Sequence, residues 1–183
     1  MKKIISGAIL LFIFVIIVSL YLTQWSISAN LKKQSFTKKD IISVEGYSKD
    51  AEHLTQIYLL ADSNKIGIVG LTDQGFGIWK DEQLGWVITN PKFEEFATSS
   101  MSIHKNRGIN GYIETHIFVA AYLDNDVKPQ ITGNSDFYLN VDYYTVNNKV
   151  LLFAHAIAGR NVSGFGTTEV IDYLMSRLNT QMK

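Results

Sequence analysis

An imidazole, a carboxylate and an amide, those of His155, Asp142 and Asn140, fall in one predicted β-hairpin near the end of the chain. An imidazole beside a carboxylate can serve as a general base or bind a ligand, so His155 with Asp142 or Asn140 is the candidate catalytic group. Apolar residues share the predicted face with His155. A structural histidine, hydrogen-bonded within the core, is therefore the competing interpretation.

This grouping depends on the register of the hairpin. Residues 137–146 and 149–158 read as strands, and Asn147-Asn148 between them can form a two-residue turn because asparagine tolerates positive φ. If Val146 pairs with Lys149, Asn140 lies opposite His155 and Asp142 lies diagonal to it. A slip of one residue would separate the three side chains.

A second candidate site lies where a glycine-rich segment enters the last predicted helix. Free N–H groups at a helix N-terminus attract anions, and Arg160, Gly164, Gly166 and Thr167 could together hold a carboxylate or phosphate. The segment has neither a Walker motif nor a dinucleotide-binding fingerprint. An ordinary glycine-rich connection with a threonine cap is the alternative.

Other site chemistry finds little support in the sequence. The chain has no cysteine, which excludes disulfides, thiolate metal sites and a cysteine nucleophile. Its histidines, at positions 53, 104, 116 and 155, lack the spacing of a local metal site, so we predict no metal and no cofactor. Residues 24–183 carry 15 basic and 17 acidic residues, and this near-neutral balance argues against nucleic-acid binding.

The first residues predict a membrane anchor. Residues 4–22 carry no charge, and at about 1.5 Å per residue such a helix spans a bilayer core of roughly 30 Å. The run is longer than the apolar core of a signal peptide, although small residues near Ser28 leave cleavage and secretion as the alternative. Lysines lie on both sides of it. We expect the N-terminus inside and the following domain outside the cytoplasm.

Domain organisation follows from this anchor. We predict an anchor over residues 1–23, a lysine-rich juxtamembrane linker over 24–47 and one α+β domain over 48–183. The anchor would place the protein in the cell membrane as a single-pass protein. The four lysines at 32, 33, 38 and 39 are typical of a solvated spacer or of a contact with anionic head groups or polymers.

The predicted fold class is α+β with one antiparallel sheet of five to six strands and the order α-βββ-α-βββ-α after the anchor. Helical periodicity predicts a helix over residues 49–60, although 56–61 also read as a strand. Residues 66–71, 76–80 and 84–89 predict a meander, 92–99 a short helix and 99–111 a loop. Residues 112–123 are apolar on both faces, which is typical of a central strand, and an amphipathic helix begins at Thr167 or Thr168.

Function is the least determined property. The anchor without a complete catalytic set indicates a membrane-anchored protein with a non-catalytic extracytoplasmic domain that binds a ligand, a protein partner or an envelope polymer. An aromatic strip on the predicted strands could serve such a partner. The alternatives are a cell-envelope hydrolase that uses His155 with Asp142 or Asn140, and a structural component of a membrane assembly.

Overall fold

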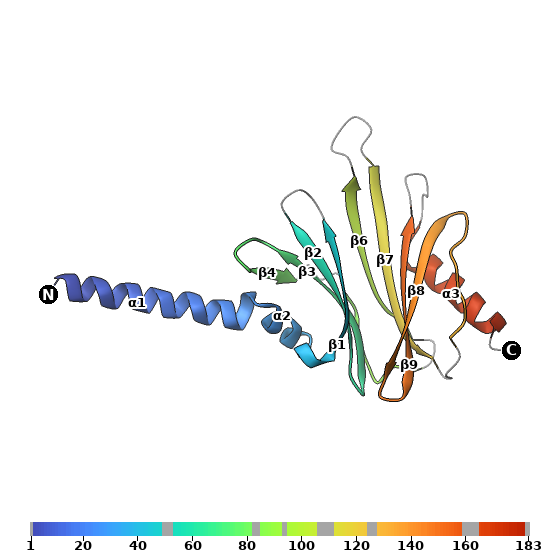
Figure 1. Ribbon diagram of the computed structural model, residues 1–183, viewed down its shortest axis with the longest axis horizontal. Helices are drawn as coiled ribbons and strands as arrows, with labels where there is room; N and C mark the ends of the chain where they lie inside the picture. The colour runs from blue at the N-terminus through green and yellow to red at the C-terminus, as the bar shows by residue number, and fades with distance from the viewer. Residues whose placement is uncertain are drawn as a thin grey trace.

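Two antiparallel β-sheets form the body of the protein in the computed structural model, which describes residues 2–48, 53–81, 85–92, 95–105, 112–123, 128–158 and 165–181 (Figure 1). The helical elements are α1 (Lys2–Leu20), the π-helical turn η1 (Tyr21–Trp25), α2 (Ile27–Lys33), the 3-10 turn η2 (Lys38–Asp40) and α3 (Thr167–Gln181). The strands are β1 (Ile41–Ser48), β2 (Leu54–Ala61), β3 (Lys65–Asp73), β4 (Trp79–Asp81), β5 (Val87–Thr89), β6 (Ala97–Lys105), β7 (Tyr112–Leu123), β8 (Phe137–Val146) and β9 (Lys149–Ala158).

The strands divide between the two sheets in chain order. Sheet A has the order β1-β2-β3-β4, with β5 also paired to β3, and sheet B has the order β6-β7-β9-β8. The sheets meet beside β5, where Gly85 bridges to Ser99 and the Trp86 N–H donates to the Thr98 carbonyl over 2.9 Å. The strands β1 and β8 are thus the far ends of a strongly curved arrangement.

Buried side chains lie in three layers. One apolar core fills the space between the sheets, a second lies between sheet B and α3, and a third lies between sheet A and α2. Figure 1 shows the resulting order, with α2 and α3 on opposite outer sides of the paired sheets. Because sheet A and sheet B are each covered on both faces, their central strands are apolar in both directions.

The predicted α+β class with antiparallel pairing is confirmed, but the predicted order of elements is wrong. The described chain places all of its strands after α2 and before α3, in two sheets rather than one. No helix interrupts the strands within the described residues. The three strands predicted as a meander also pair differently, since β4 and β5 both pair with β3.

The helix predicted over residues 49–60 is wrong because its apolar spacing has another cause. Residues 49–52 lie outside the described part, and 54–61 form β2. There Ile57 and Leu59 face the core between the sheets, while Tyr58 and Leu60 face the core under α2. A strand buried on both faces carries apolar residues at nearly every position, and some of these match a helical period.

The short helix predicted over 92–99 and the loop predicted over 99–111 are also wrong, because residues 97–105 form β6. Ala97, Met101 and Ile103 are buried, while Ser100 and Ser102 are exposed. This alternation with a period of two is the pattern of a strand with one buried face. The serines favoured the prediction of a loop, because serine is common in loops.

The later elements agree with the predictions. The strand β7 occupies residues 112–123 between two partners, and β8 and β9 form the predicted hairpin. Asn147 and Asn148 have φ of 50° and 61°, as a two-residue turn requires. The helix α3 buries Val170, Leu174 and Leu178 against sheet B.

Residues 24–47, predicted as a linker, contain η1, α2, η2 and β1. The Ser26 side chain caps α2 by accepting from the Ala29 N–H over 3.1 Å. Leu31 and Phe36 are fully buried against sheet A. The lysines of this segment lie on its solvent side, while its few apolar residues attach it to the domain.

Candidate functional site

The predicted hairpin register is confirmed around His155. Asn140 pairs with His155 and Asp142 pairs with Phe153. Asn140 and Asp142, however, bond to each other at the exposed edge strand, with the Asn140 amide donating over 3.1 Å to the Asp142 carboxylate. His155 is only 7% exposed, and its imidazole nitrogens bond to other residues. The register was therefore correct, while the partners of the histidine were different.

These partners form a polar cluster between the sheets, which we call the histidine cluster: Glu45, Tyr47, Glu114, His116 and His155. Nδ1 of His155 lies 3.1 Å from the Tyr47 hydroxyl and 3.5 Å from the Glu45 carboxylate. Its Nε2 lies 2.9 Å from Nδ1 of His116, and Nε2 of His116 lies 3.5 Å from the Glu114 carboxylate. Three strands, β1, β7 and β9, thus supply one connected chain of polar groups.

Apolar and aromatic packing encloses the histidine cluster. The Phe118 ring stacks on His155 with centroids 4.5 Å apart, and Tyr47 meets both imidazoles edge-on. Burial and, as the smaller cause, the neighbouring His116 together lower the pKa of His155 to about 4. His155 is therefore neutral at pH 7.

At the other end of the cluster, the pKa values of Glu45 and Tyr47 are both raised. Burial raises the pKa of Glu45, and the charge of Asp142 adds to this, while the hydrogen bond from Tyr47 acts against it. Burial, the hydrogen bond to Glu45 and the charge of Glu45 raise the pKa of Tyr47, so its phenol stays protonated.

Counting donors gives one consistent arrangement of protons. The Tyr47 hydroxyl donates to Glu45, so its oxygen accepts from the Nδ1–H of His155. Nε2 of neutral His155 then accepts from the Nδ1–H of His116. The other nitrogen of His116 lies 3.5 Å from the Glu114 carboxylate, at the end of this chain of groups. Both nitrogens of His155 are thus occupied by protein partners.

The part of the chain that the structure describes offers no cluster of candidate metal ligands. Among those residues, no group of three or more histidine, cysteine, aspartate or glutamate side chains has the geometry to hold a metal ion. In the histidine cluster the imidazole nitrogens face each other at hydrogen-bond distance, which leaves no space for an ion between them.

The predicted anion site falls partly outside the described residues, which exclude Arg160 and Gly164. Gly166 and Thr167 do lie at the N-terminus of α3, as expected. A Cβ placed on Gly166 would lie 3.1 Å from the carboxylate of Glu169. The positive end of α3 thus already faces a carboxylate of its own first turn.

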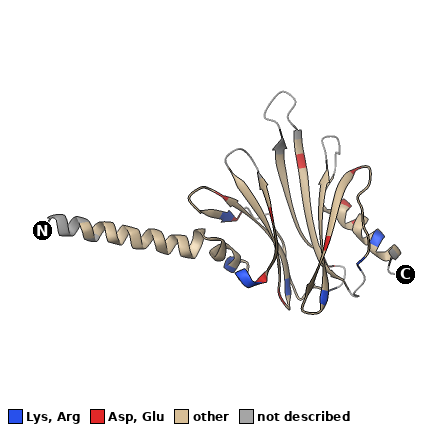
Figure 2. Ribbon diagram, in the orientation of Figure 1, with Lys and Arg blue, Asp and Glu red and all other residues tan. Residues whose placement is uncertain are grey.

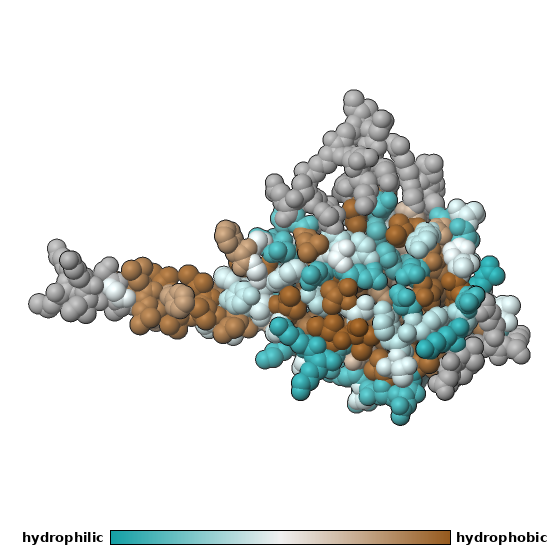
Figure 3. Space-filling view, in the orientation of Figure 1, coloured by the Kyte–Doolittle hydropathy of each residue, from teal (hydrophilic) through white to brown (hydrophobic). Residues whose placement is uncertain are grey.

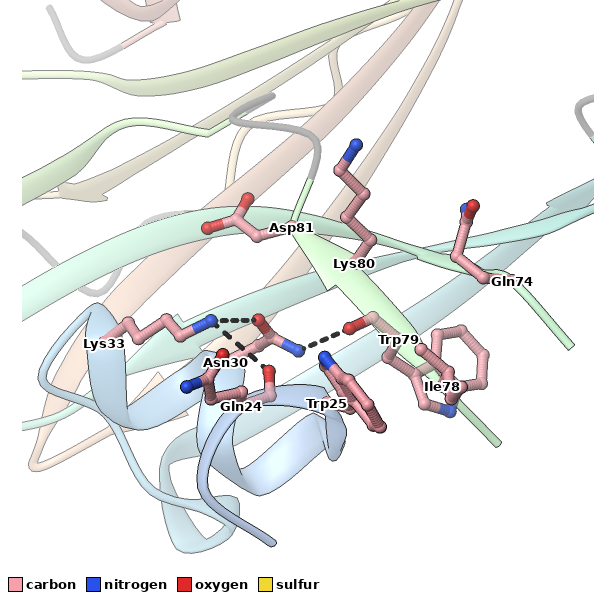
Figure 4. A pocket seen from close by; sticks show the side chains of 9 residues that line it. All are labelled: Gln24, Trp25, Asn30, Lys33, Gln74, Ile78, Trp79, Lys80 and Asp81. Atoms are coloured by element: carbon pink, nitrogen blue, oxygen red, sulfur yellow. Dashed lines mark hydrogen bonds between the residues drawn. The ribbon is translucent and has the colours of Figure 1, made fainter. Parts of the chain in front are cut away.

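A groove that sequence reasoning missed lies between the η1–α2 segment and β4 (Figure 4). Its volume is about 470 Å³, within the range of ligand pockets. It is lined by Gln24, Trp25, Asn30, Lys33, Gln74, Ile78, Trp79, Lys80 and Asp81. Two indoles, amides and charges of both signs thus face one open hollow, which we call the juxtamembrane groove because it begins two residues after the apolar run.

Buried Asn30 fixes the walls of the juxtamembrane groove. Its Nδ2 donates to the Trp79 carbonyl over 2.8 Å and to the Ser26 carbonyl over 3.1 Å. Its Oδ1 accepts from Lys33 Nζ over 3.2 Å, and the same ammonium donates to the Gln24 carbonyl (Figure 4). Asn30 also covers the edge of the short strand β4, which would otherwise expose free backbone groups.

The signal for this groove was weak because its two walls are about 50 residues apart in the sequence. Trp25 and Asn30 lie in a lysine-rich stretch that reads as a spacer. Only the pairing of Asn30 with Trp79 brings the two indoles to the same hollow.

A second hollow, of about 340 Å³, lies beside Tyr143 and Pro129 on sheet B.

The helix that leads toward the groove, α1, is apolar along its described length. Its described large side chains, from Ile9 to Val18, are exposed, and Figure 2 shows no charged residue along it beyond the grey start. Among the described residues, no single helix is both long and apolar enough to cross a membrane. The segments Ile9–Trp25 and Ile27–Lys33, bent by 50°, meet that criterion only as a pair.

Comparisons of this chain with protein-family models, with curated proteins and with solved structures give no significant match.

Proposed function

We propose that this protein is a single-pass membrane protein whose extracytoplasmic α+β domain binds a peptide segment of a partner protein in the juxtamembrane groove, without catalysis. The observation that carries the proposal is the open groove with Trp25 and Trp79 on its walls. Tryptophan side chains in a partly enclosed hollow are the groups that most often dominate the energy of protein binding.

The charges around the groove suit a polar peptide. Lys80 is exposed, and Asp81 accepts from the Gln34 amide over 3.0 Å, so charges of both signs lie beside the indoles. Such a mixture favours a segment that carries both apolar and charged side chains over a purely anionic or purely apolar ligand.

The anchor in this proposal is α1. The sides of this helix are apolar and exposed, which is unfavourable in water and favourable in a bilayer. Figure 3 shows the described part of α1 as an apolar rod that leaves the domain. Gln24 and Trp25, which follow the apolar run, line the groove. A ligand in the groove would therefore lie close to the membrane surface.

Catalysis by the histidine cluster is the weaker alternative. Both nitrogens of His155 are bonded to protein groups, and neither described hollow is lined by the cluster. A general base needs a free nitrogen within reach of a substrate. The cluster fits a structural role better.

A photo-crosslinking experiment tests the binding proposal. A photoreactive amino acid at Lys80 of the full chain, in membranes of the source cell, should give a discrete adduct with one protein. The same group at Asn179 on α3, far from the groove, is the matched control. The purified partner should then lose most of its affinity for the Trp79→Ala variant, because the indole wall is removed. Equal adducts at both positions, or none at Lys80, would contradict the proposal.

A further inference from the structure

Phe76 is the most exposed large apolar residue in the described part of the chain. It lies in the turn between β3 and β4, and its side chain is fully exposed. Other strongly exposed apolar side chains lie mainly on α1. A fully exposed aromatic ring buries little apolar surface against the domain and contributes little to its core.

The backbone of this turn directs the ring outward at a conformational cost. Gly75, Phe76 and Gly77 have φ of 86°, 54° and 73°. Glycine adopts this left-handed region freely, but a bulky residue rarely does. The turn is also well bonded, because the Gln74 N–H donates to the Ile78 carbonyl over 2.8 Å and the Ile78 N–H donates to the Gly75 carbonyl over 3.0 Å. A defined turn therefore presents Phe76.

The turn lies beside the end of the apolar helix. A Cβ placed on Gly77 would lie 3.5 Å from the hydroxyl oxygen of Tyr21, the first residue of η1. Figure 1 shows the β3–β4 turn on the side of the domain from which α1 leaves, and Figure 3 shows an apolar knob beside the base of the helical rod. The turn that carries Phe76 thus lies close to the end of the apolar run.

Other residues near this level are those found at membrane surfaces. Tyr21 lies at the end of the apolar run and Trp25 follows it, and aromatic rings of this kind collect at the head-group layer. Lys33 and Lys80 lie on the walls of the adjoining groove, and Figure 2 shows basic residues on the segment after α1 and on β4. Such side chains favour an anionic lipid surface.

We propose that Phe76 inserts into the same bilayer that holds α1, as a second membrane contact of the domain. This inference rests on the proposed membrane anchor. One helix leaves a domain free to turn about the helix axis, whereas a second contact fixes its orientation. The juxtamembrane groove, which shares Gln74 and Ile78 with this turn, would then be held against the head-group layer.

The absence of cysteine allows a direct test with single thiols in the full chain. An environment-sensitive NBD label is attached to Gln74→Cys, which leaves Phe76 in place, in vesicles of phosphatidylcholine and phosphatidylglycerol. Nitroxide-labelled lipids should quench this label several-fold more strongly than the same label on the distant control Asn179→Cys. Adding Phe76→Asp should reduce the quenching to the level of the control.

A third label, on Leu11→Cys, reports the anchor itself. If Leu11 is quenched and Gln74 is not, the second contact is overturned and the anchor stands. If the labels at Leu11 and Gln74 both remain in water, the anchor and the second contact both fail. The Gln74 label could also leave water without being quenched by the lipids, to an extent that rises with protein density. Phe76 would then contact a second copy of the chain, which also overturns the proposal.

Discussion

Nδ1 of His116 lies 2.9 Å from Nε2 of His155, diagonally across the pair of strands β7 and β9. The other nitrogen of His155 lies 3.1 Å from the hydroxyl of Tyr47, which belongs to β1 in sheet A. His155 is therefore a polar link between the two sheets, next to an otherwise apolar core. This arrangement requires His155 to be neutral, because its Nδ1–H donates to the Tyr47 hydroxyl while its Nε2 accepts from His116.

The first prediction concerns the stability of the protein at low pH. The ordinary pKa of histidine is 6.5 and that of folded His155 is about 4, so between these pH values the unfolded chain binds a proton that the folded protein does not. The free energy of unfolding should therefore fall as the pH falls through this window, by up to about 3 kcal/mol, and reach a plateau below it. Thermal unfolding of the full chain in detergent, followed by near-UV circular dichroism, measures it.

The control for this prediction removes the titrating group. Other ionisable side chains near His155 are Glu45 from β1, Glu114 and His116 from β7, and Asp142 from β8. The raised pKa of Glu45 acts in the opposite sense, because its contribution is present at low pH and is lost as the pH rises through that pKa. The variant His155→Gln should show a flatter pH dependence. Equal slopes for both proteins would contradict the prediction.

A second prediction concerns the Tyr47 hydroxyl. Tyr47→Phe removes the group that contacts both Glu45 and His155 and leaves their polar atoms without it. Loss of this partner should cost about 1 to 3 kcal/mol of unfolding free energy. The matched control is Tyr138→Phe, since Tyr138 is 65% exposed and its change should have almost no effect. Urea unfolding at pH 7 distinguishes them, and equal stabilities would refute the role of Tyr47.

A third prediction concerns the junction of the two sheets at Gly85. A Cβ there would lie 1.5 Å from the backbone oxygen of Ile68, so Gly85→Ala requires the backbone to move and should destabilise the protein by more than about 2 kcal/mol. A Cβ placed on Gly46 would have as its nearest atom a flexible side-chain carbon of Leu54, 3.7 Å away. Gly46→Ala should therefore be tolerated. A comparison of melting temperatures tests the pair.

A fourth prediction concerns Asn30, which is 1% exposed. Asn30→Ala removes the donor to the Trp79 carbonyl and should cost about 1 to 3 kcal/mol. It should also loosen the groove, so that the emission of Trp25 and Trp79 shifts to longer wavelength. Asn179→Ala, on the exposed side of α3, is the control. An unchanged emission spectrum in Asn30→Ala would show that this residue does not hold the groove.

The parts of the fold that were predictable are those in which local pattern and pairing agree. Asn147-Asn148 specifies a tight turn, and the turn length alone sets Asn140 opposite His155. The apolar spacing of Val170, Leu174 and Leu178 specifies the buried side of α3. In both cases the interactions that decide the structure lie within a few residues.

The same reasoning failed for β2 and β6. Ile57 and Tyr58 are buried on opposite faces of one strand, so their spacing carries no period that separates a strand from a helix. The partners of His155 were also out of reach, because Tyr47 and His116 come from strands 108 and 39 residues away in the chain. The residues next to His155 in the sequence therefore do not predict these partners.

By itself, the sequence determined the apolar helix, the hairpin with its register, the final helix and the absence of thiol chemistry, since each depends on composition or on neighbours in the chain. Tertiary structure alone decided that β1 faces β9 across the core, that Asn30 reaches Trp79 and that the β3–β4 turn lies beside Tyr21. The physical reason is that burial joins residues from distant segments, and the free energy of that burial depends on complementary surfaces that no single segment contains.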